Sequence, residues 1–428
     1  MRGTRLSIGM AVIAAVGFAT LLMTSMPVVA QTETVLHSFA GTDGISPVVS
    51  VVFDSAGNLY GVASQGGGSN NGTVFELTPN KNKWTEKTLL SFNGGAGGAM
   101  PLGGLIFDSA GNLYGTTKLG GANGVGTAFE LIKSKSGAWS ETVLHSFGSG
   151  KDGQYAVGNL NFDGAGNLYG STQGGGAYSN ATETSGGTVF KLAPKKGGGW
   201  TETVLHSFGN AKDGNSPRSN VILDKEGNLY GTTNAGGAYG SGTVYELSPK
   251  SGGGWTEKVL YSFDSKYAVN GDNNGYKPVA GLTLDTSGNL YGTTAYGGYY
   301  GGGVAYELSP KSGGSWTETV IYAFDFLNAS EVGSTLYSGL VLDKEGNLYG
   351  TTLLGGDGTY FGNGTAFELK PPTKSGGTWS LDTLYVFQAS DGTQPGTGYV
   401  TLDSDGSVYG GTQAGGANLD GVVFKITP

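Results

Sequence analysis

The histidines are the first residues to consider for chemistry, because imidazole is the commonest general base and the commonest transition-metal ligand in proteins. The chain contains three, His37, His145 and His206. Each stands at the same position of a recurring segment, Trp-Thr-Glu-Thr-Val-Leu-His-Ser-Phe or a variant, where another copy carries Leu90 and the rest a tyrosine. A position that accepts leucine is typical of packing, and three histidines on three separate copies do not converge on one substrate. We therefore predict no catalytic histidine and no metal site.

Most carboxylates repeat in the same way. An aspartate that begins a hairpin of the type Asp-x-x-Gly-Asn can accept hydrogen bonds from the backbone amides of the turn, and the glycine supplies the positive φ that short loops need. Ca²⁺ requires six to eight oxygens and one aspartate offers at most two. We therefore expect turn support, with a hairpin calcium site as the alternative and no other cofactor. The hairpin aspartates are Asp54, Asp108, Asp163, Asp224, Asp285, Asp343 and Asp403.

One arginine and a group of tyrosines break the repetition. Arg218 is the only arginine beyond the first five residues, and it follows Pro217 where other copies have an aliphatic residue. A guanidinium there is suited to gripping a carboxylate, and an ion pair with Asp213 or Asp152 is the alternative. Tyrosine offers a stacking face and a hydroxyl, which suits sugars and extended polymers, although these tyrosines equally suit packing within their own loops. The candidate binding residues are Arg218, Tyr239, Tyr276, Tyr296, Tyr299, Tyr300, Tyr337 and Tyr360.

The elements that must position these residues come from an internal repeat. The motif Gly-Asn-Leu-Tyr-Gly begins at Gly57, Gly111, Gly166, Gly227, Gly288 and Gly346, with a degenerate copy at Gly406. A second motif, Gly-Thr-(Val/Ala)-(Phe/Tyr)-Glu-Leu, follows each copy. Repeats of this length indicate a solenoid or a propeller. The expected units cover about residues 40–92, 93–147, 148–208, 209–263, 264–324, 325–387, and 388–428 together with 31–39.

Each unit is predicted to form four short antiparallel strands, A to D, because the segments are β-branched, aromatic and without a helical period. In the second unit we expect strands at 104–108, 112–117, 126–131 and 139–147. Four such strands repeated seven times indicate an all-β fold, a seven-bladed β-propeller in one domain over 31–428. The segment 32–39 is a strand D without preceding strands, and the chain ends on a strand C. The first strand is therefore expected to complete the last blade and close the ring.

These motifs resemble the Gloeo/Verruco (GloVer) tandem-repeat family. The segments that carry the resemblance are Gly-Asn-Leu-Tyr-Gly-Thr-Thr-x-x-Gly-Gly, as at Gly227 to Gly237, and Gly-Thr-Val-Tyr-Glu-Leu-Ser-Pro at Gly242 to Pro249. The resemblance covers residues 31–428 in seven copies. It implies an exported bacterial protein, often with a C-terminal sorting or anchoring segment. It brings no established activity and no catalytic residues.

The first thirty residues have the pattern of a signal peptide. Arg2 and Arg5 give a positive start, an uncharged apolar run follows, and Pro27-Val-Val-Ala30 offers small residues at the cleavage site. We predict cleavage after Ala30 and a secreted or periplasmic monomer without membrane contact. The net charge of −9 argues against nucleic acid as a partner, and the lack of cysteine excludes disulfides.

Taken together, the residues favour a non-catalytic module that binds a carbohydrate or a cell-envelope polymer through the loops of the third to sixth units. The alternative is an enzyme of the propeller lyase or lactonase type with a site in the central channel. There the sequence offers Asn159, Asn161 and Asn220 near Arg218. A purely structural surface protein is the third interpretation.

Overall fold

The computed structural model describes residues 31–428, apart from 49, 82, 180–184, 211–212, 266–273, 327–331, 357–361 and 375. Residues Gln31–Pro428 form one compact unit. In the described residues every regular element is a β-strand, so the all-β prediction is confirmed. No helix in this part of the chain is long and apolar enough to cross a membrane.

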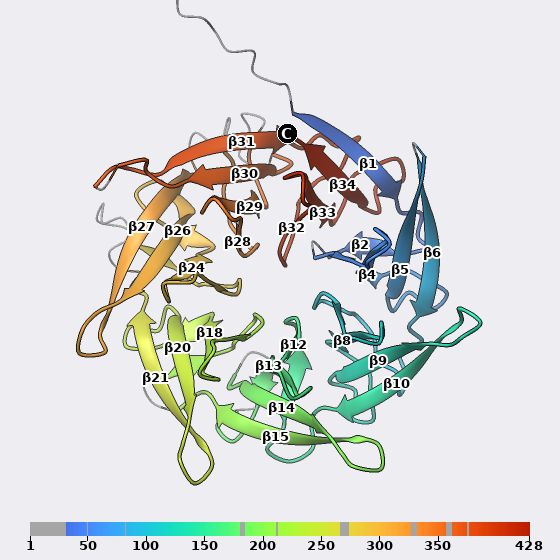
Figure 1. Cartoon of the computed structure of the whole chain (residues 1–428), viewed down its shortest axis with the longest axis horizontal. Helices are drawn as coiled ribbons and strands as arrows, with labels where there is room; N and C mark the ends of the chain where they lie inside the picture. The colour runs from blue at the N-terminus through green and yellow to red at the C-terminus, as the bar shows by residue number, and fades with distance from the viewer. Residues whose placement is uncertain are drawn as a thin grey trace, which may run out of the picture. The chain divides into compact units, whose positions relative to one another are not determined.

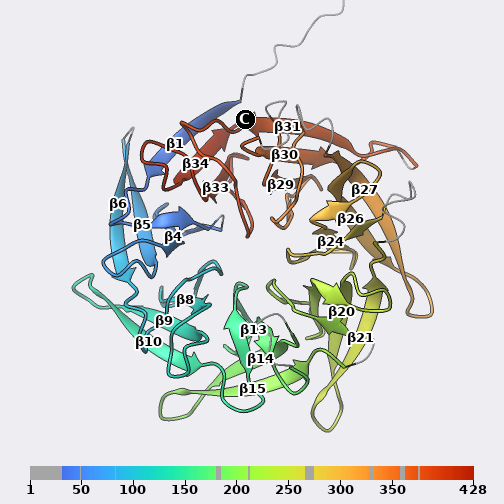
Figure 2. The ribbon, with the colours of Figure 1, turned by 180° about the vertical axis from the view of Figure 1, so that it is seen from behind.

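The strands form seven small antiparallel sheets arranged in a ring, which confirms the seven-bladed propeller (Figure 1). The chain runs round the ring in order, one blade after the next, as the view from behind also shows (Figure 2). Within each blade the strands follow the order A, B, C, D from the centre outward. The central strands therefore come from all seven repeats and face a common axis.

Strand A is the shortest element and has only two residues in every blade. The A strands are β3 (Val52–Phe53), β7 (Ile106–Phe107), β12 (Asn161–Phe162), β17 (Ile222–Leu223), β23 (Thr283–Leu284), β28 (Val341–Leu342) and β32 (Thr401–Leu402). The B strands are β4 (Leu59–Gln65), β8 (Leu113–Thr117), β13 (Leu168–Gly175), β18 (Leu229–Thr233), β24 (Leu290–Thr293), β29 (Leu348–Thr352) and β33 (Val408–Thr412).

The outer strands are longer. The C strands are β5 (Thr73–Asn80), β9 (Thr127–Lys133), β14 (Thr188–Pro194), β20 (Thr243–Pro249), β26 (Gly301–Pro310), β30 (Thr365–Lys370) and β34 (Val422–Thr427). The D strands are β6 (Lys83–Ser91), β10 (Trp139–Ser146), β15 (Trp200–Ser207), β21 (Trp255–Ser262), β27 (Trp316–Asp325), β31 (Ser380–Val386) and β1 (Thr32–Ser38).

Several loops that the sequence suggested to be irregular contain short strands of their own. They are β2 (Ile45–Pro47), β11 (Gly153–Ala156), β16 (Gly214–Asn215), β19 (Ala235–Gly236), β22 (Gly275–Tyr276) and β25 (Tyr296–Gly297). In each case the segment before strand A pairs with the end of strand B or with the loop after it in the same blade. This pairing gives the D–A and B–C loops a common face, which we call the loop face.

The two ends of the described chain meet in the last blade. Strand β1 pairs antiparallel with β34, with Thr32 opposite Thr427 and Ser38 opposite Val422. The sheet therefore has the order β1, β34, β33, β32. In Figure 1 the blue N-terminal strand lies beside the dark red C-terminal one.

The hairpin between strands A and B owes its geometry to the repeated aspartate. Asp108 Oδ1 accepts the backbone N–H groups of Ala110 and Asn112 over 2.9 and 2.8 Å. Its Oδ2 accepts from the Asn112 side chain and from the Tyr114 hydroxyl. The predicted turn-support role is confirmed, and the same pattern explains why leucine and tyrosine follow the glycine and asparagine at fixed spacing.

Aromatic side chains fill the seams between blades. The ring of Trp139, on strand D of blade 2, packs edge to face against Tyr60, on strand B of blade 1, with centroids 6.2 Å apart. Trp200 and Tyr114 repeat this contact one blade further on. Tryptophans that open the outer strands thus pack across the seams between neighbouring blades.

A second repeated feature fixes the position of each blade relative to the preceding one. Seven residues just before strand A have positive φ values: Ser46, Met100, Tyr155, Ser216, Lys277, Thr335 and Gln394. The Ser216 N–H, for example, donates to the carbonyl of Gly186 in the preceding blade over 2.8 Å. Left-handed backbone at a residue other than glycine is costly and persists where surrounding contacts hold it. These contacts set the position of residues two places further on, including Arg218 and Tyr337.

Candidate functional site

The inner ends of the blades contribute one residue each to a ring around the central axis. These residues stand four places before the hairpin aspartate and are Ser50, Gly104, Asn159, Asn220, Gly281, Gly339 and Tyr399. Ser50, Asn159, Asn220 and Tyr399 of this ring line a central cavity of about 550 Å³, and Asn161 lines it as well. The three asparagines expected at the channel thus do face it.

Tyr399 is the one large side chain in this ring. Its hydroxyl donates a hydrogen bond to Asn220 Oδ1 over 2.7 Å. Gly281 and Gly339 leave the space that the ring occupies, since a Cβ atom on Gly339 would lie 2.2 Å from Tyr399 Cε1. Tyr399 also lines a second, smaller cavity of about 30 Å³. It therefore separates the central cavity from the mouth on the loop face.

Arg218 and Tyr337 lie at this mouth. Both line the small cavity, together with Gly398 and Tyr399. The Tyr337 hydroxyl lies 3.2 Å from that of Tyr296, within hydrogen-bond distance. The structure thus brings together residues from blades 4, 5 and 6 that are more than a hundred positions apart in the sequence.

Tyr296 contacts a further aromatic ring, that of Tyr276, and a second cation, Lys277. It stacks on Tyr276, with centroids 5.7 Å apart and an angle of 30° between the planes. The pair is held in register because Tyr276 and Tyr296 are partners in the β22–β25 pairing. Lys277 Nζ lies 5.6 Å from the centre of the Tyr296 ring, a cation–π distance. We call Arg218, Tyr276, Lys277, Tyr296 and Tyr337 the mouth cluster.

The charge of Arg218 is not neutralised within the described residues. Its side chain is exposed, and no carboxylate in that part of the chain lies within ion-pair distance. The expected alternative, an ion pair with Asp152 or Asp213, is wrong. Asp152 and Asp213 instead bind His145 and His206, at 2.8 and 3.1 Å.

Three further candidate tyrosines lie outside the mouth cluster. Tyr239, Tyr299 and Tyr300 are exposed on the B–C loops of blades 4 and 5, with 58, 63 and 47% of their surface accessible. Tyr299 packs edge to face on Tyr300, with centroids 4.8 Å apart. Tyr360 lies outside the described residues. Sequence reasoning missed Tyr399 and Lys277, although Tyr399 was visible as a residue that breaks the repeat.

Burial governs the titration of the Tyr337 hydroxyl. Desolvation, followed by the contact with Tyr296, raises its pKa to about 12, and the charge of Arg218 opposes this only in part. A phenol with a raised pKa keeps its proton at neutral pH. Tyr337 is therefore equipped to donate a hydrogen bond and poorly equipped to act as a base.

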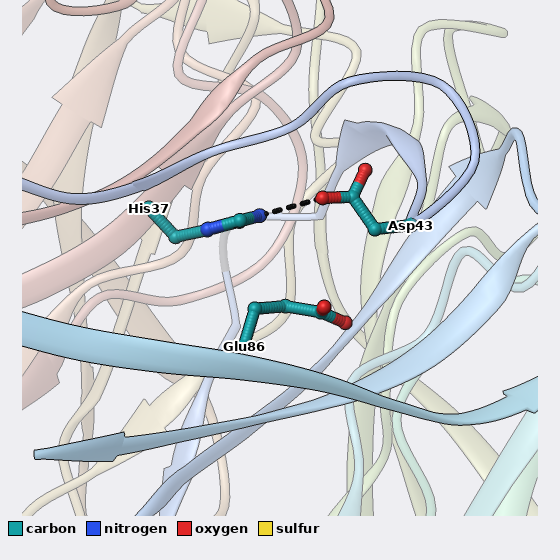
Figure 3. Close-up of side chains that lie close together, drawn as sticks. All are labelled: His37, Asp43 and Glu86. Carbon is teal, nitrogen blue, oxygen red and sulfur yellow. Dashed lines mark hydrogen bonds and ion pairs between the residues drawn. The ribbon is translucent and has the colours of Figure 1, made fainter.

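The histidines form a second set of polar contacts, at the outer edge of the blade seams. His37 Nε2 lies 2.9 Å from Asp43 Oδ2, and the carboxylate of Glu86, on strand D of the next blade, lies beside them (Figure 3). His145, Asp152 and Glu202 repeat this arrangement one third of the way round the ring. We call these two trios the seam groups.

The sequence interpretation of these histidines was incomplete. They do pack, since the His37 ring lies edge to face on Phe39 at 4.8 Å. However, each also pairs with an aspartate, and the sequence had suggested Arg218 rather than a histidine as the partner of Asp152 or Asp213. Spacing within one repeat conceals such trios, because Glu86 and Glu202 come from the neighbouring blade.

Comparison with known families identifies the repeat. The sequence profile of the Gloeobacter/Verrucomicrobia repeat matches residues 22–198 and again residues 142–361. The chain belongs to this repeat family. The resemblance drawn from the Gly-Asn-Leu-Tyr-Gly segments is thereby confirmed, and the repeat family's two matched regions span most of the propeller. Among curated proteins no match was found.

Solved structures similar to this member of the repeat family include three bacterial proteins of low sequence identity. A Bacteroides uniformis protein named as a 6-phosphogluconolactonase has 12% identity and a TM-score of 0.48, with 86% of this chain and 89% of that one covered. A Dyadobacter fermentans protein of unknown function has 13% identity and a TM-score of 0.44, covering 82% and 96%. A Thermus thermophilus protein named as a glucose dehydrogenase has 16% identity and a TM-score of 0.42, covering 76% and 96%. Likeness at this level assigns no activity to the chain.

Proposed function

We propose that the chain is an exported binding module that takes an acidic carbohydrate at the mouth of its central cavity. The observation that carries this proposal is the exposed guanidinium of Arg218 beside the hydroxyl-bearing ring of Tyr337, both lining the small mouth cavity. A guanidinium binds a carboxylate through two parallel hydrogen bonds. Aromatic faces next to it suit the apolar side of a sugar ring.

The side chains of the mouth cluster are already ordered in the absence of a ligand. Tyr296 is held by stacking on Tyr276, and its hydroxyl in turn meets that of Tyr337. Lys277 adds a second positive charge beside Tyr296. A site whose side chains are already ordered loses less entropy on binding, which favours affinity. Two cations near a rigid aromatic group favour an acidic over a neutral sugar.

The raised pKa of Tyr337 supports binding rather than catalysis. A lyase that removes a proton next to a carboxylate needs a base whose pKa lies near the working pH. Burial and the contact with Tyr296 raise the pKa of Tyr337 to about 12, which is far above a neutral working pH. The lyase or lactonase alternative is therefore less favoured at this cluster. The binding experiment also tests this alternative, because an enzyme would shorten the oligomers.

The test uses oligomers of a uronic acid, with neutral glucan oligomers of equal length as the comparison. We expect the acidic oligomers to bind in isothermal titration calorimetry and the neutral ones to bind at least tenfold more weakly. Arg218→Ala is expected to weaken binding of the acidic oligomers at least tenfold, and Arg218→Lys by a smaller factor because lysine lacks the planar fork.

A matched control removes an exposed cation elsewhere. Lys311→Ala deletes one positive charge from the turn between strands C and D of blade 5, on the face opposite the loops. This variant should bind like the wild type. Equal losses of affinity in Arg218→Ala and Lys311→Ala would show that only the net charge of the protein matters, and would refute the site. Shortened oligomers with a new unsaturated end would instead establish the enzyme.

Export is the second part of the proposal and rests on the first thirty residues. The positive start, the apolar run and the small residues before Gln31 support removal of a signal peptide. N-terminal sequencing of the protein recovered from outside the cytoplasm should begin at Gln31. An intact Met1 in that fraction would contradict cleavage.

A further inference from the structure

The seam groups bring three different donor atoms together, far from the mouth cluster. In each trio, one histidine nitrogen, one aspartate oxygen and one glutamate oxygen all lie within 4.8 Å of one another. Within the described residues only the trios at His37 and His145 meet this distance. Each draws its ligands from two blades and one loop, so the three side chains are fixed by separate elements.

We propose that the two seam groups are binding sites for a borderline divalent cation of the Zn²⁺ type. The ligands are the imidazole and two carboxylates of His37, Asp43 and Glu86, and those of His145, Asp152 and Glu202. Imidazole together with carboxylate suits Zn²⁺ and similar ions, whereas Ca²⁺ and Mg²⁺ prefer oxygen alone. Three protein ligands leave a fourth position for water.

The geometry requires little movement to accept an ion. Ligands on a tetrahedral zinc lie roughly 3.3 Å apart, given bonds of about 2.0–2.1 Å to nitrogen and oxygen. His145 Nε2 and Asp152 Oδ2 are 2.8 Å apart and would separate by a few tenths of an ångström. The glutamate oxygen lies within 4.8 Å of the other two atoms and would have to approach them on binding.

The aspartate is preorganised and the histidine remains reachable. Asp152 Oδ2 accepts the Gly148 N–H over 3.1 Å, while Oδ1 accepts the Gly153 N–H. Its side chain is only 7% exposed, and that of His145 is 22% exposed. An ion can therefore approach the partly exposed imidazole from solvent, and the buried carboxylate beside it provides a fixed anionic ligand.

The glutamate of the second trio lacks a partner of its own. Glu202 Oε1 is buried and has no hydrogen bond with any described residue, a state it shares with Oε1 of Glu141, Glu257 and Glu318 at the same position of other blades. An unpaired carboxylate oxygen removed from water is unfavourable unless a cation compensates it. A metal ion held by His145 and Asp152 would supply that compensation at the atom that needs it.

The trio His206, Asp213 and Glu257, at the seam of blades 3 and 4, has the same residue types but does not meet the 4.8 Å distance, and two other seams lack this ligand set. At the seam of blades 1 and 2, Leu90 replaces histidine and no carboxylate occurs between Asn93 and Ala99. At the seam of blades 6 and 7, the Tyr385 hydroxyl donates to Asp391 Oδ2 over 2.7 Å. Leucine and tyrosine are therefore both accommodated by this fold at the histidine position, which supplies matched substitutions.

The experiment titrates metal-free full-length protein with ZnCl₂ and counts bound ions by calorimetry and elemental analysis. We expect two ions per chain, one after either His37→Leu or His145→Leu, and none in the double variant. Glu202→Gln should weaken the His145 site at least tenfold. Crystals grown with Zn²⁺ should give two anomalous peaks at the zinc edge, each within bonding distance of the histidine nitrogen.

Two results would overturn the assignment. One is an unchanged zinc stoichiometry in the His37→Leu, His145→Leu double variant. The other is anomalous density that avoids both seams. Because leucine is native at this position in blade 1, far-ultraviolet circular dichroism and the thermal midpoint of each variant establish that the propeller is intact. Calcium at equal concentration should bind neither seam, and calcium binding there would contradict the ligand chemistry.

Discussion

The hydroxyl of Tyr399 donates a 2.7 Å hydrogen bond to Asn220 Oδ1, and so links blade 7 to blade 4 across the central axis. These blades are not neighbours in the ring. Asn220 and Tyr399 both line the small cavity at the mouth, whose walls also include Gly281 and Gly398. One side chain therefore determines both the depth of the mouth and the cohesion of opposite blades.

Replacing Tyr399 with phenylalanine should destabilise the protein by about 1–3 kcal/mol. The change leaves Asn220 Oδ1, which belongs to a residue only 9% exposed, without its donor. Chemical denaturation measures the free energy of unfolding. Tyr239→Phe, on an exposed loop, is the control and should change it by less than about 0.5 kcal/mol. Equal stability of the two variants would contradict the link.

Gly339→Ala should destabilise through a clash with the same ring. The added Cβ would lie 2.2 Å from Tyr399 Cε1, too close for either group to stay in place. Overpacking of this kind costs about 1–3 kcal/mol. Combining it with Tyr399→Ala should remove most of the penalty, since the two changes are coupled. Gly164→Ala, where an added Cβ meets nothing within 4 Å, should have little effect.

Glu141 should make the protein less stable as the pH rises. Burial raises its pKa to about 7 in the folded state, from 4.5. Between these values the folded chain keeps a proton that the unfolded chain releases, so stability falls with rising pH up to about 7. Glu141→Gln removes this penalty and should gain about 1–3 kcal/mol above pH 7, with no gain below pH 4.5.

The measurement for Glu141 is the thermal midpoint of both proteins from pH 4 to pH 8, roughly the range over which the pKa shift acts. The control is Glu226→Gln, which changes an exposed hairpin glutamate and should leave the profile unaltered. Parallel profiles for wild type and Glu141→Gln would show that the seam carboxyl does not titrate in this range.

Asp108 should have the opposite effect to Glu141, because its contribution to stability increases as the pH rises. Burial alone would raise its pKa, but hydrogen bonds from Asn112, the Ala110 N–H and Tyr114 outweigh it and lower the pKa below 3.8. Its contribution is therefore present above pH 3.8 and is lost as the pH falls further. Asp108→Ala should cost about 2–3 kcal/mol at pH 7 in denaturation experiments, whereas the exposed Asp405→Ala should cost little.

The repeat was predictable because its determinants are local. In six hairpins the aspartate, glycine and asparagine lie within five consecutive residues, with Ser407 in place of the asparagine in the seventh. The hydrogen bonds between them, as at Asp108, stay inside that segment. The strand limits were less accurate. Strand A of the second unit was expected over 104–108 but pairs only over Ile106–Phe107, because its first residues curve into the ring around the axis.

The site was predictable only in part, because its contacts join distant blades. The position of Arg218 after Pro217 correctly suggested the mouth, since a strand start is fixed by the repeat. Its neighbour was not predictable, because Tyr337 reaches it from two blades away. The packing of the seam histidines was predictable from Leu90, but their polar contacts were not, because Glu202, which lies beside His145, belongs to another blade.

The pairing of β1 with β34 has a consequence for how the molecule is made. The outer strand of the last blade is synthesised first and its partner, Val422–Thr427, last. During translation β1 has nowhere native to dock and presents an unpaired edge for almost the whole of elongation. The ring therefore cannot close before Val422–Thr427 has been made, and the seven residues of β1 keep an unpaired edge until then.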